Sequence, residues 1–292
     1  MKHLIKIENL QKSYDDFHLK LAELKVEPGT ITGLIGANGA GKTTTIKALL
    51  GIIEPDRGTV ELFGCKATDS HAFSQAKSRV GVVLDTCPFP PDLTVKDVSL
   101  VGRSAYEQWD QGLFEELASR FNLNLAKKTS DLSRGMGMKL QLAFALAHKP
   151  DLLILDEPTA GLDPIARLEV LDLLRESIGE GRGALVSTHI TSDLEKLADY
   201  VCCIDAGQLA FSTDVDSICD RAGVLSCRAS ELDAICEAKL FDVGSLRVIQ
   251  EPYGIKALVP DRYMLGKAFP ELACERASVE SYMTLMLKGE PR

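Results

Sequence analysis

Apolar runs of strand length alternate with stretches of helical periodicity along most of the chain. Residues 31–35 and 152–155 are almost entirely apolar, which is typical of strands buried on both faces of a parallel sheet. Residues 44–50 and 139–147 have the spacing of helices. Between residues 95 and 129 apolar positions recur on one helical face, with charged residues between them. This pattern predicts an α/β fold that includes a helical region.

The pattern changes after residue 212, where short elements follow one another without a visible chemical motif. We therefore divide the chain into a large domain, residues 1–212, and a small α+β accessory domain, residues 213–292. The apolar side chains near the end of the chain are typical of a core or a dimer seam, so the accessory domain is expected to have a modest regulatory or dimerising role. The elements predicted in it are strands at residues 224–228, 246–250 and 253–259 and helices at residues 232–241 and 279–287.

A glycine-rich loop, residues 36–43, lies between the first buried strand and the helix that follows it. Its spacing is that of a loop that wraps backbone N–H groups around a nucleotide triphosphate, with the helix N-terminus facing the phosphates. In such a loop Lys42 reaches the β- and γ-phosphates, and the Thr43 hydroxyl is a ligand of Mg²⁺. An ordinary glycine-rich turn is the alternative, which the flanking strand and helix disfavour. The residues predicted to hold the nucleotide here are Gly36, Asn38, Gly39, Gly41, Lys42, Thr43 and Thr44.

Two acidic residues, Asp156 and Glu157, directly follow the second buried strand. A parallel sheet delivers the carboxyl ends of its strands to the edge where ligands bind, so Asp156 can hold Mg²⁺ directly or through water. Glu157 then lies beside the γ-phosphate, where a carboxylate can act as general base on the attacking water. Acidic residues also follow strands simply because strands end in solvent. The phosphate loop upstream favours the catalytic interpretation.

Residues 132–136, Leu-Ser-Arg-Gly-Met, precede the helical run at residues 139–147. With the phosphate loop and the acidic pair, in this order, they resemble the ATP-binding subunits of ABC transporters over roughly the first 210 residues. The resemblance implies a P-loop NTPase of ABC type, with a mixed sheet core, an antiparallel β subdomain and a helical subdomain at about residues 95–145. It also implies ATP and Mg²⁺ as cofactors and a head-to-tail dimer, in which Ser133 and Gly135 of one copy contact the γ-phosphate held by the other.

Three further positions match the family through this resemblance. Asp163 corresponds to the loop that crosses the dimer interface, and His189 to the switch histidine that senses the γ-phosphate. Tyr14 corresponds to the aromatic residue that stacks on adenine. Taken alone, a histidine at a strand end is more often structural than catalytic, and an exposed tyrosine in a turn is the alternative for Tyr14.

Two sites depart from the commonest pattern of the family. Asp85 stands where most relatives have a glutamine that gives an oxygen to Mg²⁺. Aspartate also offers an oxygen to Mg²⁺, but it adds a negative charge beside three phosphates. Because that charge is tolerable only when Mg²⁺ is close, we expect hydrolysis to depend more strongly on Mg²⁺. Arg134 and Met136 replace the usual glycine and glutamine of the signature. Arg134 either adds a contact across the dimer or points into solvent. These variations resemble the YtrB-like subgroup of bacterial ABC-2-type export ATPases.

Composition and charge narrow the class of protein further. The chain has 292 residues and a net charge of −9 without a block of Lys or Arg, which argues against a nucleic-acid partner. Adjacent Cys202 and Cys203 lie in a strand-like run and are expected to be buried on opposite faces. The start lacks the apolar core of a signal peptide, and apolar stretches fall short of the ~20 residues of a spanning helix. We therefore expect a cytoplasmic protein, held peripherally on the inner face of the cell membrane through a permease.

The function predicted from sequence is that of an ATP-hydrolysing motor subunit. Two copies, in a homodimer or a heterodimer with a second ATPase subunit, close on Mg²⁺–ATP and drive a separate integral membrane permease of ABC-2 type, as an exporter. A soluble ABC-type ATPase acting on DNA or the ribosome is the first alternative, which the missing coiled-coil insertion disfavours. A nucleotide-gated module without catalysis is disfavoured by the presence of Glu157 and His189, and a simple P-loop kinase by the signature.

Overall fold

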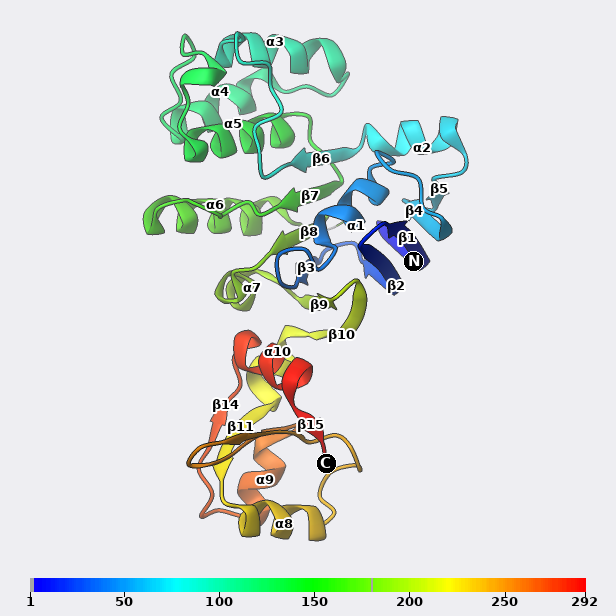
Figure 1. Ribbon diagram of the computed structural model, residues 1–292. Coiled ribbons are helices and arrows are strands. Elements are labelled where there is room, and N and C mark those ends of the chain that lie inside the picture. Colours follow the sequence, from blue (N-terminus) through cyan, green and yellow to red (C-terminus); the bar gives the residue numbers. More distant parts are fainter. Residues whose placement is uncertain (1–2, 180) are drawn as a thin grey trace.

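The computed structural model describes residues 3–179 and 181–292, which form two parts, each built around one β-sheet (Figure 1). The sheet of the larger part has ten strands. In spatial order these are β5 (Cys65–Lys66), β4 (Arg57–Leu62), β1 (Ile5–Tyr14), β2 (Phe17–Val26), β10 (Gln208–Asp214), β9 (Tyr200–Asp205), β3 (Ile31–Ile35), β8 (Gly183–Thr188), β7 (Leu152–Asp156) and β6 (Val80–Val83).

The ten strands combine a parallel and an antiparallel half. Strands β9, β3, β8, β7 and β6 are parallel and include both buried runs predicted from the sequence. Strands β2, β1, β4 and β5 are antiparallel. The halves are joined through β10, which pairs antiparallel with β9 and meets β2 at the single pair Gln208 and Lys20. The predicted α/β fold with a mixed sheet core and antiparallel β strands is confirmed.

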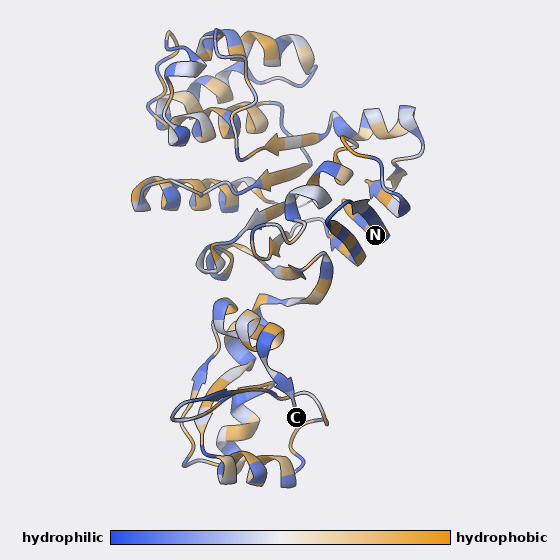
Figure 2. Cartoon of the chain, in the orientation of Figure 1, coloured by the Kyte–Doolittle hydropathy of each residue, from blue (hydrophilic) through white to orange (hydrophobic). Residues whose placement is uncertain are grey.

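Helices cover both faces of this sheet, and two hydrophobic cores result. Alternate residues of a strand point to opposite faces, so Leu153 and Leu155 of β7 belong to one core, and Leu152 and Ile154 to the other. Figure 2 shows how strongly apolar residues concentrate in these parallel strands. The core of Leu152 is covered by α1 (Lys42–Leu49) and α2 (Ser70–Lys77), and that of Leu153 by α3 (Val95–Ala105), α4 (Gln111–Arg120), α5 (Arg134–Ala147), α6 (Pro164–Ser177) and α7 (Thr191–Leu197).

The adjacent cysteines Cys202 and Cys203 lie in different hydrophobic cores, one on each face of the sheet. Cys202 packs in the core under α1 and Cys203 in the opposite core, as the strand pattern predicted. Burial raises the pKa of the Cys203 thiol to about 12, which keeps this thiol protonated and unreactive. All eight cysteines are free thiols.

Helices α3, α4 and α5 stand together at the end of the large part farthest from the accessory domain (Figure 1). Polar side chains set their starts: Thr94 and Asp97 form a capping box at α3, and Asp110 accepts the Leu113 N–H at α4. Trp109 packs its ring against Gly102, where an added Cβ would come within 2.3 Å of the indole. The tryptophan ring is partly buried and packs against the larger core. None of the described helices is long and apolar enough to cross a membrane.

The smaller part contains a five-stranded antiparallel sheet with helices on both faces. Its order of elements, strand–helix–strand–strand–helix–strand, forms two interleaved split β-α-β units. The sequence had indicated three of the strands, α8 and α10, but α9, which contains Gly266, and the short strands β14 and β15 were not predicted. The elements are β14 (Cys274–Arg276), β11 (Gly223–Cys227), β13 (Gly254–Val259), β12 (Arg247–Glu251) and β15 (Glu290–Pro291), with α8 (Ala229–Glu237), α9 (Arg262–Ala268) and α10 (Val279–Lys288).

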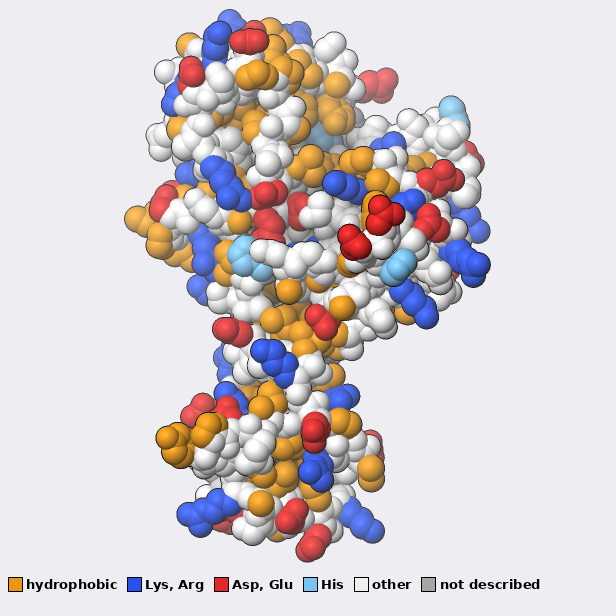
Figure 3. All heavy atoms as spheres, in the orientation of Figure 1, with side chains coloured by type: hydrophobic (Ala, Val, Ile, Leu, Met, Phe, Trp, Pro, Cys, Tyr) orange, Lys and Arg blue, Asp and Glu red, His pale blue; other side chains and the backbone are white. Residues whose placement is uncertain are grey.

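Helix α10, predicted as a core or dimer helix, connects the two parts at the waist visible in Figure 3. Leu285 is buried against the accessory sheet, while the Tyr282 ring lies edge-on to Phe211 of β10 with ring centroids 5.1 Å apart. The backbone N–H of Val279 donates to Glu195 of α7 at 2.8 Å. The division of the chain at residue 212 stays a prediction of the sequence.

The attachment through α10 predicts a loss of stability when Tyr282 is truncated. Replacing Tyr282 with Ala removes a half-buried ring from both cores and is expected to lower the free energy of unfolding by about 2 kcal/mol. Urea denaturation measures this loss. Tyr253→Ala is the matched control, since the Tyr253 side chain is fully exposed. Equal effects of the two substitutions would contradict the role given to Tyr282.

Candidate active site

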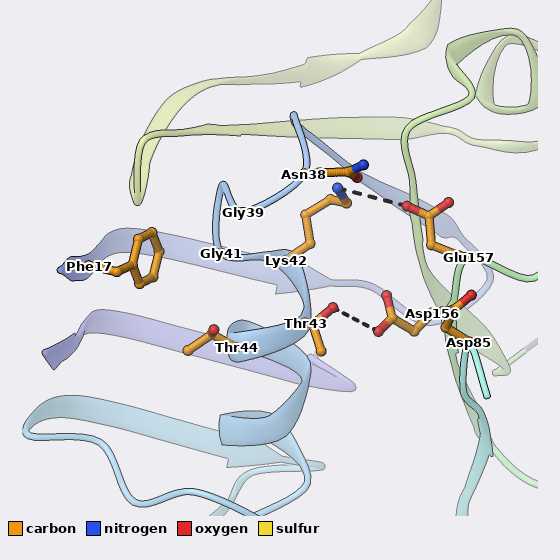
Figure 4. A pocket seen from close by; sticks show the side chains of 10 residues that line it. All are labelled: Phe17, Asn38, Gly39, Gly41, Lys42, Thr43, Thr44, Asp85, Asp156 and Glu157. Atoms are coloured by element: carbon orange, nitrogen blue, oxygen red, sulfur yellow. Dashed lines mark hydrogen bonds and ion pairs between the residues drawn. The ribbon is translucent and has the colours of Figure 1, made fainter. Parts of the chain in front are cut away.

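The phosphate loop and the ends of strands β6 and β7 surround a cavity of about 480 Å³ (Figure 4). Strand β3 delivers the loop and β7 delivers the two acids to the same sheet edge, because both strands are parallel members of one sheet. The structure thus brings together groups that are more than a hundred residues apart in sequence. The cavity is lined by Phe17, Asn38, Gly39, Gly41, Lys42, Thr43, Thr44, Asp85, Asp156 and Glu157.

The loop itself is shaped to receive an anion. Gly36 has φ 156°, and a Cβ there would come within 2.2 Å of the Ile204 carbonyl oxygen, so the position requires glycine. Gly41, the residue before helix α1, provides no side-chain cap, which leaves the first N–H groups of the helix for a phosphate. Lys42 is only 6% exposed and donates to the Gly36 carbonyl at 2.8 Å. Its ammonium group is therefore held against the loop.

Thr43 and Asp156 form the part of the cavity that fits Mg²⁺. The Thr43 hydroxyl donates to one carboxylate oxygen of Asp156 at 3.0 Å, and the Ser187 hydroxyl donates to the other. Asp156 is 4% exposed, so its carboxylate is oriented by these contacts rather than by water. Hydroxyl and carboxylate oxygens beside a phosphate loop are the ligands that Mg²⁺ prefers. These residues fit the metal predicted from the sequence.

Glu157 points into the same cavity from the residue after β7 (Figure 4). Its backbone has φ 54°, a conformation that residues other than glycine rarely adopt and that clusters at functional sites. One carboxylate oxygen lies 2.8 Å from Nδ1 of His189, and the other lies 3.8 Å from Nζ of Lys42. The predicted base and the predicted switch histidine, 32 residues apart, are thus direct partners.

The signature residues lie elsewhere. Ser133 caps α5 by accepting the Met136 N–H, and Asp163 caps α6 by accepting from Ile165 and Ala166, which lowers the pKa of its carboxyl. With Gly135 they line a second cavity of about 480 Å³. Within one chain, therefore, Ser133, Gly135 and Asp163 do not belong to the cavity that contains the phosphate loop.

Aromatic residues at the cavity differ from the expectation. Tyr14 ends β1, is 45% exposed and is not among the residues that line the cavity. Phe17, its partner across the β1–β2 turn, is the aromatic residue that lines it. Two aromatic residues separated only by Asp15 and Asp16 were the available signal for Phe17. Stacking of Tyr14 on adenine stays a prediction.

The two departures from the common family pattern are joined to each other. Arg134, the first residue of α5, forms an ion pair with Asp85, in the loop after β6. The sequence had placed Arg134 either across a dimer or in solvent, and had placed Asp85 at the metal. Neither expectation included this contact, because the two residues are 49 positions apart.

Known proteins similar to this chain agree with the geometry. Residues 19–160 match the family model described as "ABC transporter". The "Nod factor export ATP-binding protein I" of Burkholderia orbicola (strain AU 1054) is 40% identical over 212 residues, covering 70% of this chain and 68% of that protein. The protein of the same name from Cupriavidus metallidurans is 38% identical over 219 residues, which cover 71% of this chain and 70% of that protein. A solved structure described as "Structure of ATP binding subunit of ABC transporter" superposes with a TM-score of 0.67 and is 29% identical in sequence. The match covers 74% of this chain and 91% of the chain in that structure.

Proposed function

Since this chain belongs to the ATP-binding subunits of ABC transporters, we propose that it hydrolyses ATP and thereby drives a separate membrane permease. One observation carries the proposal: the phosphate loop, the Asp156 carboxylate and the Glu157 carboxylate all face a single cavity. Phosphoryl transfer to water needs a phosphate cradle, a metal site and a base in this arrangement.

The proposed reaction gives roles to four of the cavity residues and to His189 beside them. Lys42 and the N–H groups at the start of α1 bind the phosphates, and Thr43 with Asp156 holds Mg²⁺. When bound, the metal supplies positive charge beside the phosphate oxygens. Glu157 accepts the proton of the attacking water at its carboxylate, and the 2.8 Å contact from His189 orients that carboxylate. His189 is half exposed, so its ring can also meet the γ-phosphate.

The second cavity supports action as a dimer. Ser133, Gly135 and Asp163 line it together, at the N-terminus of α5, where an anion is favoured. Because they are separate from the phosphate loop of their own chain, a second ATPase subunit would bring its bound triphosphate to them. We infer that two chains close head to tail on two nucleotides.

The permease and the direction of transport are inferred from the relatives. The curated relatives are named as export proteins, so we propose that the partner is an integral membrane exporter subunit. The proposal that this subunit is of ABC-2 type rests on the sequence resemblance alone. The chain would then be bound peripherally on the cytoplasmic face of the membrane, without a nucleic-acid partner.

Affinity purification of the tagged full chain from detergent-solubilised native membranes tests this function. We expect a multi-spanning membrane protein to co-purify in stoichiometric amount and to be identified by mass spectrometry. Recovery of ribosomes, nucleic acid or only soluble proteins would contradict the proposal. A tagged Tyr282→Ala chain in parallel shows whether the packing of α10 against β10 is needed for the association.

A further inference from the structure

The ion pair between Asp85 and Arg134 joins the nucleotide cavity to the signature helix within one chain. We propose that this pair is a latch that Mg²⁺–ATP opens, which frees Arg134 for the triphosphate bound by the opposing subunit. The proposal rests on the proposed function, because it assumes that Mg²⁺–ATP occupies the cavity and that a second subunit meets the signature.

The backbone before the latch is firmly held, so Asp85 and the loop that follows it are the part that can move. The buried side-chain amide of Gln141, on α5, accepts from the Leu84 N–H at 2.9 Å and donates to the Leu84 carbonyl at 3.1 Å. This contact fixes the chain at the residue before Asp85. The side chains of Asp85 and Arg134 are themselves 48% and 54% exposed. An ion pair with that exposure is weak and exchanges readily.

Asp85 stands in the wall between two cavities. It lines the nucleotide cavity together with Thr43 and Asp156, and it lines a neighbouring cavity together with Arg134. Mg²⁺ beside the phosphates attracts the Asp85 carboxylate and so competes with Arg134. ATP without the metal has the opposite effect, because the bare phosphates repel the carboxylate toward the guanidinium. The latch therefore opens only for the metal complex.

Freed Arg134 is already placed at the second cavity. It lies between Ser133 and Gly135 at the first residue of α5, and its Cδ is 3.4 Å from the position of a Cβ on Gly161. With Asp85 withdrawn, this end of the helix carries an unpaired cation and favours an anion. Occupation of one cavity by Mg²⁺–ATP thus prepares the same chain for its partner's nucleotide.

A double-mutant cycle on nucleotide affinity tests the latch. Adenosine 5′-(β,γ-imido)triphosphate is titrated into dilute monomer of the wild type, Arg134→Gln, Asp85→Asn and the double variant, with Mg²⁺ or with EDTA. We measure how much Arg134→Gln changes the affinity for the nucleotide in two backgrounds, wild type and Asp85→Asn. With Mg²⁺ we expect the gain in affinity to be about two- to five-fold larger in the wild-type background than in the Asp85→Asn background. In EDTA this coupling should vanish or reverse in sign.

Hydrogen exchange gives a readout that does not depend on binding affinity. Arg134→Gln without nucleotide should raise amide exchange at residues 85–87 and 133–137 to the level that Mg²⁺ and the analogue produce in the wild type. Arg120→Gln is the control, since Arg120 forms a comparably exposed ion pair with Glu176 at 3.0 Å. It should change neither binding nor exchange at these residues.

The outcomes separate the latch from the proposed function. If the coupling between Asp85 and Arg134 is zero with Mg²⁺, or is equal with and without the metal, the latch is overturned. Nucleotide binding by the wild type would in that case leave the proposed ATPase function intact. Failure of the wild type to bind the Mg²⁺ analogue would instead overturn the proposed function. Coupling that requires Mg²⁺, with matching exchange in the two loops, supports the latch.

Discussion

Replacing Glu157 with Gln is expected to slow ATP hydrolysis by roughly 10²- to 10⁴-fold, which is the usual contribution of a general base. The amide of glutamine keeps the size of the side chain and can still contact His189 and Lys42, but it cannot take the proton of the attacking water. Binding of ATP should therefore persist, and the closed dimer should accumulate because turnover no longer opens it. Single-turnover hydrolysis and size-exclusion chromatography with Mg²⁺–ATP measure the two effects.

The control for this experiment is Glu169→Gln. Glu169 is a carboxylate on α6 that accepts from Lys139 at 3.0 Å and does not line the cavity of the phosphate loop. The control chain should hydrolyse ATP as the wild type does. A fully active Glu157→Gln protein would overturn the assignment of the base, and loss of ATP binding would show that the residue serves the nucleotide rather than the water.

Acidification is expected to destabilise the protein through His148, which follows α5. His148 is 3% exposed, its ring stacks on Tyr106 with centroids 4.1 Å apart, and its Nδ1 atom is buried without a hydrogen-bond partner. The neighbouring cavity is lined by two cations, Arg79 and Lys149, and two carboxylates, Glu107 and Asp151. Burial lowers the pKa of His148 to about 4.

The sign of the effect follows from the protons bound in each state. Between the folded pKa of about 4 and the ordinary value near 6.5, the unfolded chain binds a proton at this histidine and the folded chain does not. Stability due to His148 is therefore complete above about pH 6.5 and is lost as the pH falls toward about 4, by up to about 3 kcal/mol.

Urea denaturation across this pH range tests the contribution of His148. The comparison is between the wild type and His148→Phe, which keeps an aromatic ring against Tyr106 but cannot titrate. The variant should lose less stability on acidification, while His71→Phe, which replaces an exposed histidine on α2, should follow the wild-type curve. Parallel curves for wild type and His148→Phe would contradict the role given to this histidine.

The local elements of the site could be predicted because their signals lie within short segments. The run at residues 31–35 is followed directly by its glycine loop and helix, and the run at residues 152–155 by its two acids. The parallel pairing of β3, β8 and β7 then brings both ends to one edge of the sheet.

Side-chain partners far apart in sequence were decided only by the tertiary structure. The contact of Glu157 with His189, the choice of Phe17 over Tyr14 at the cavity and the pairing of Asp85 with Arg134 all depend on how β8, the β1–β2 turn and α5 pack around β7.

By itself, then, the sequence determined the phosphate loop, the acids and the strands that carry them, because periodicity and spacing are local properties of the chain. The tertiary structure decided which charged and aromatic side chains meet, and placed the signature in a cavity apart from the loop. Those contacts depend on side-chain direction and on the packing of distant elements. No single segment of the sequence specifies either.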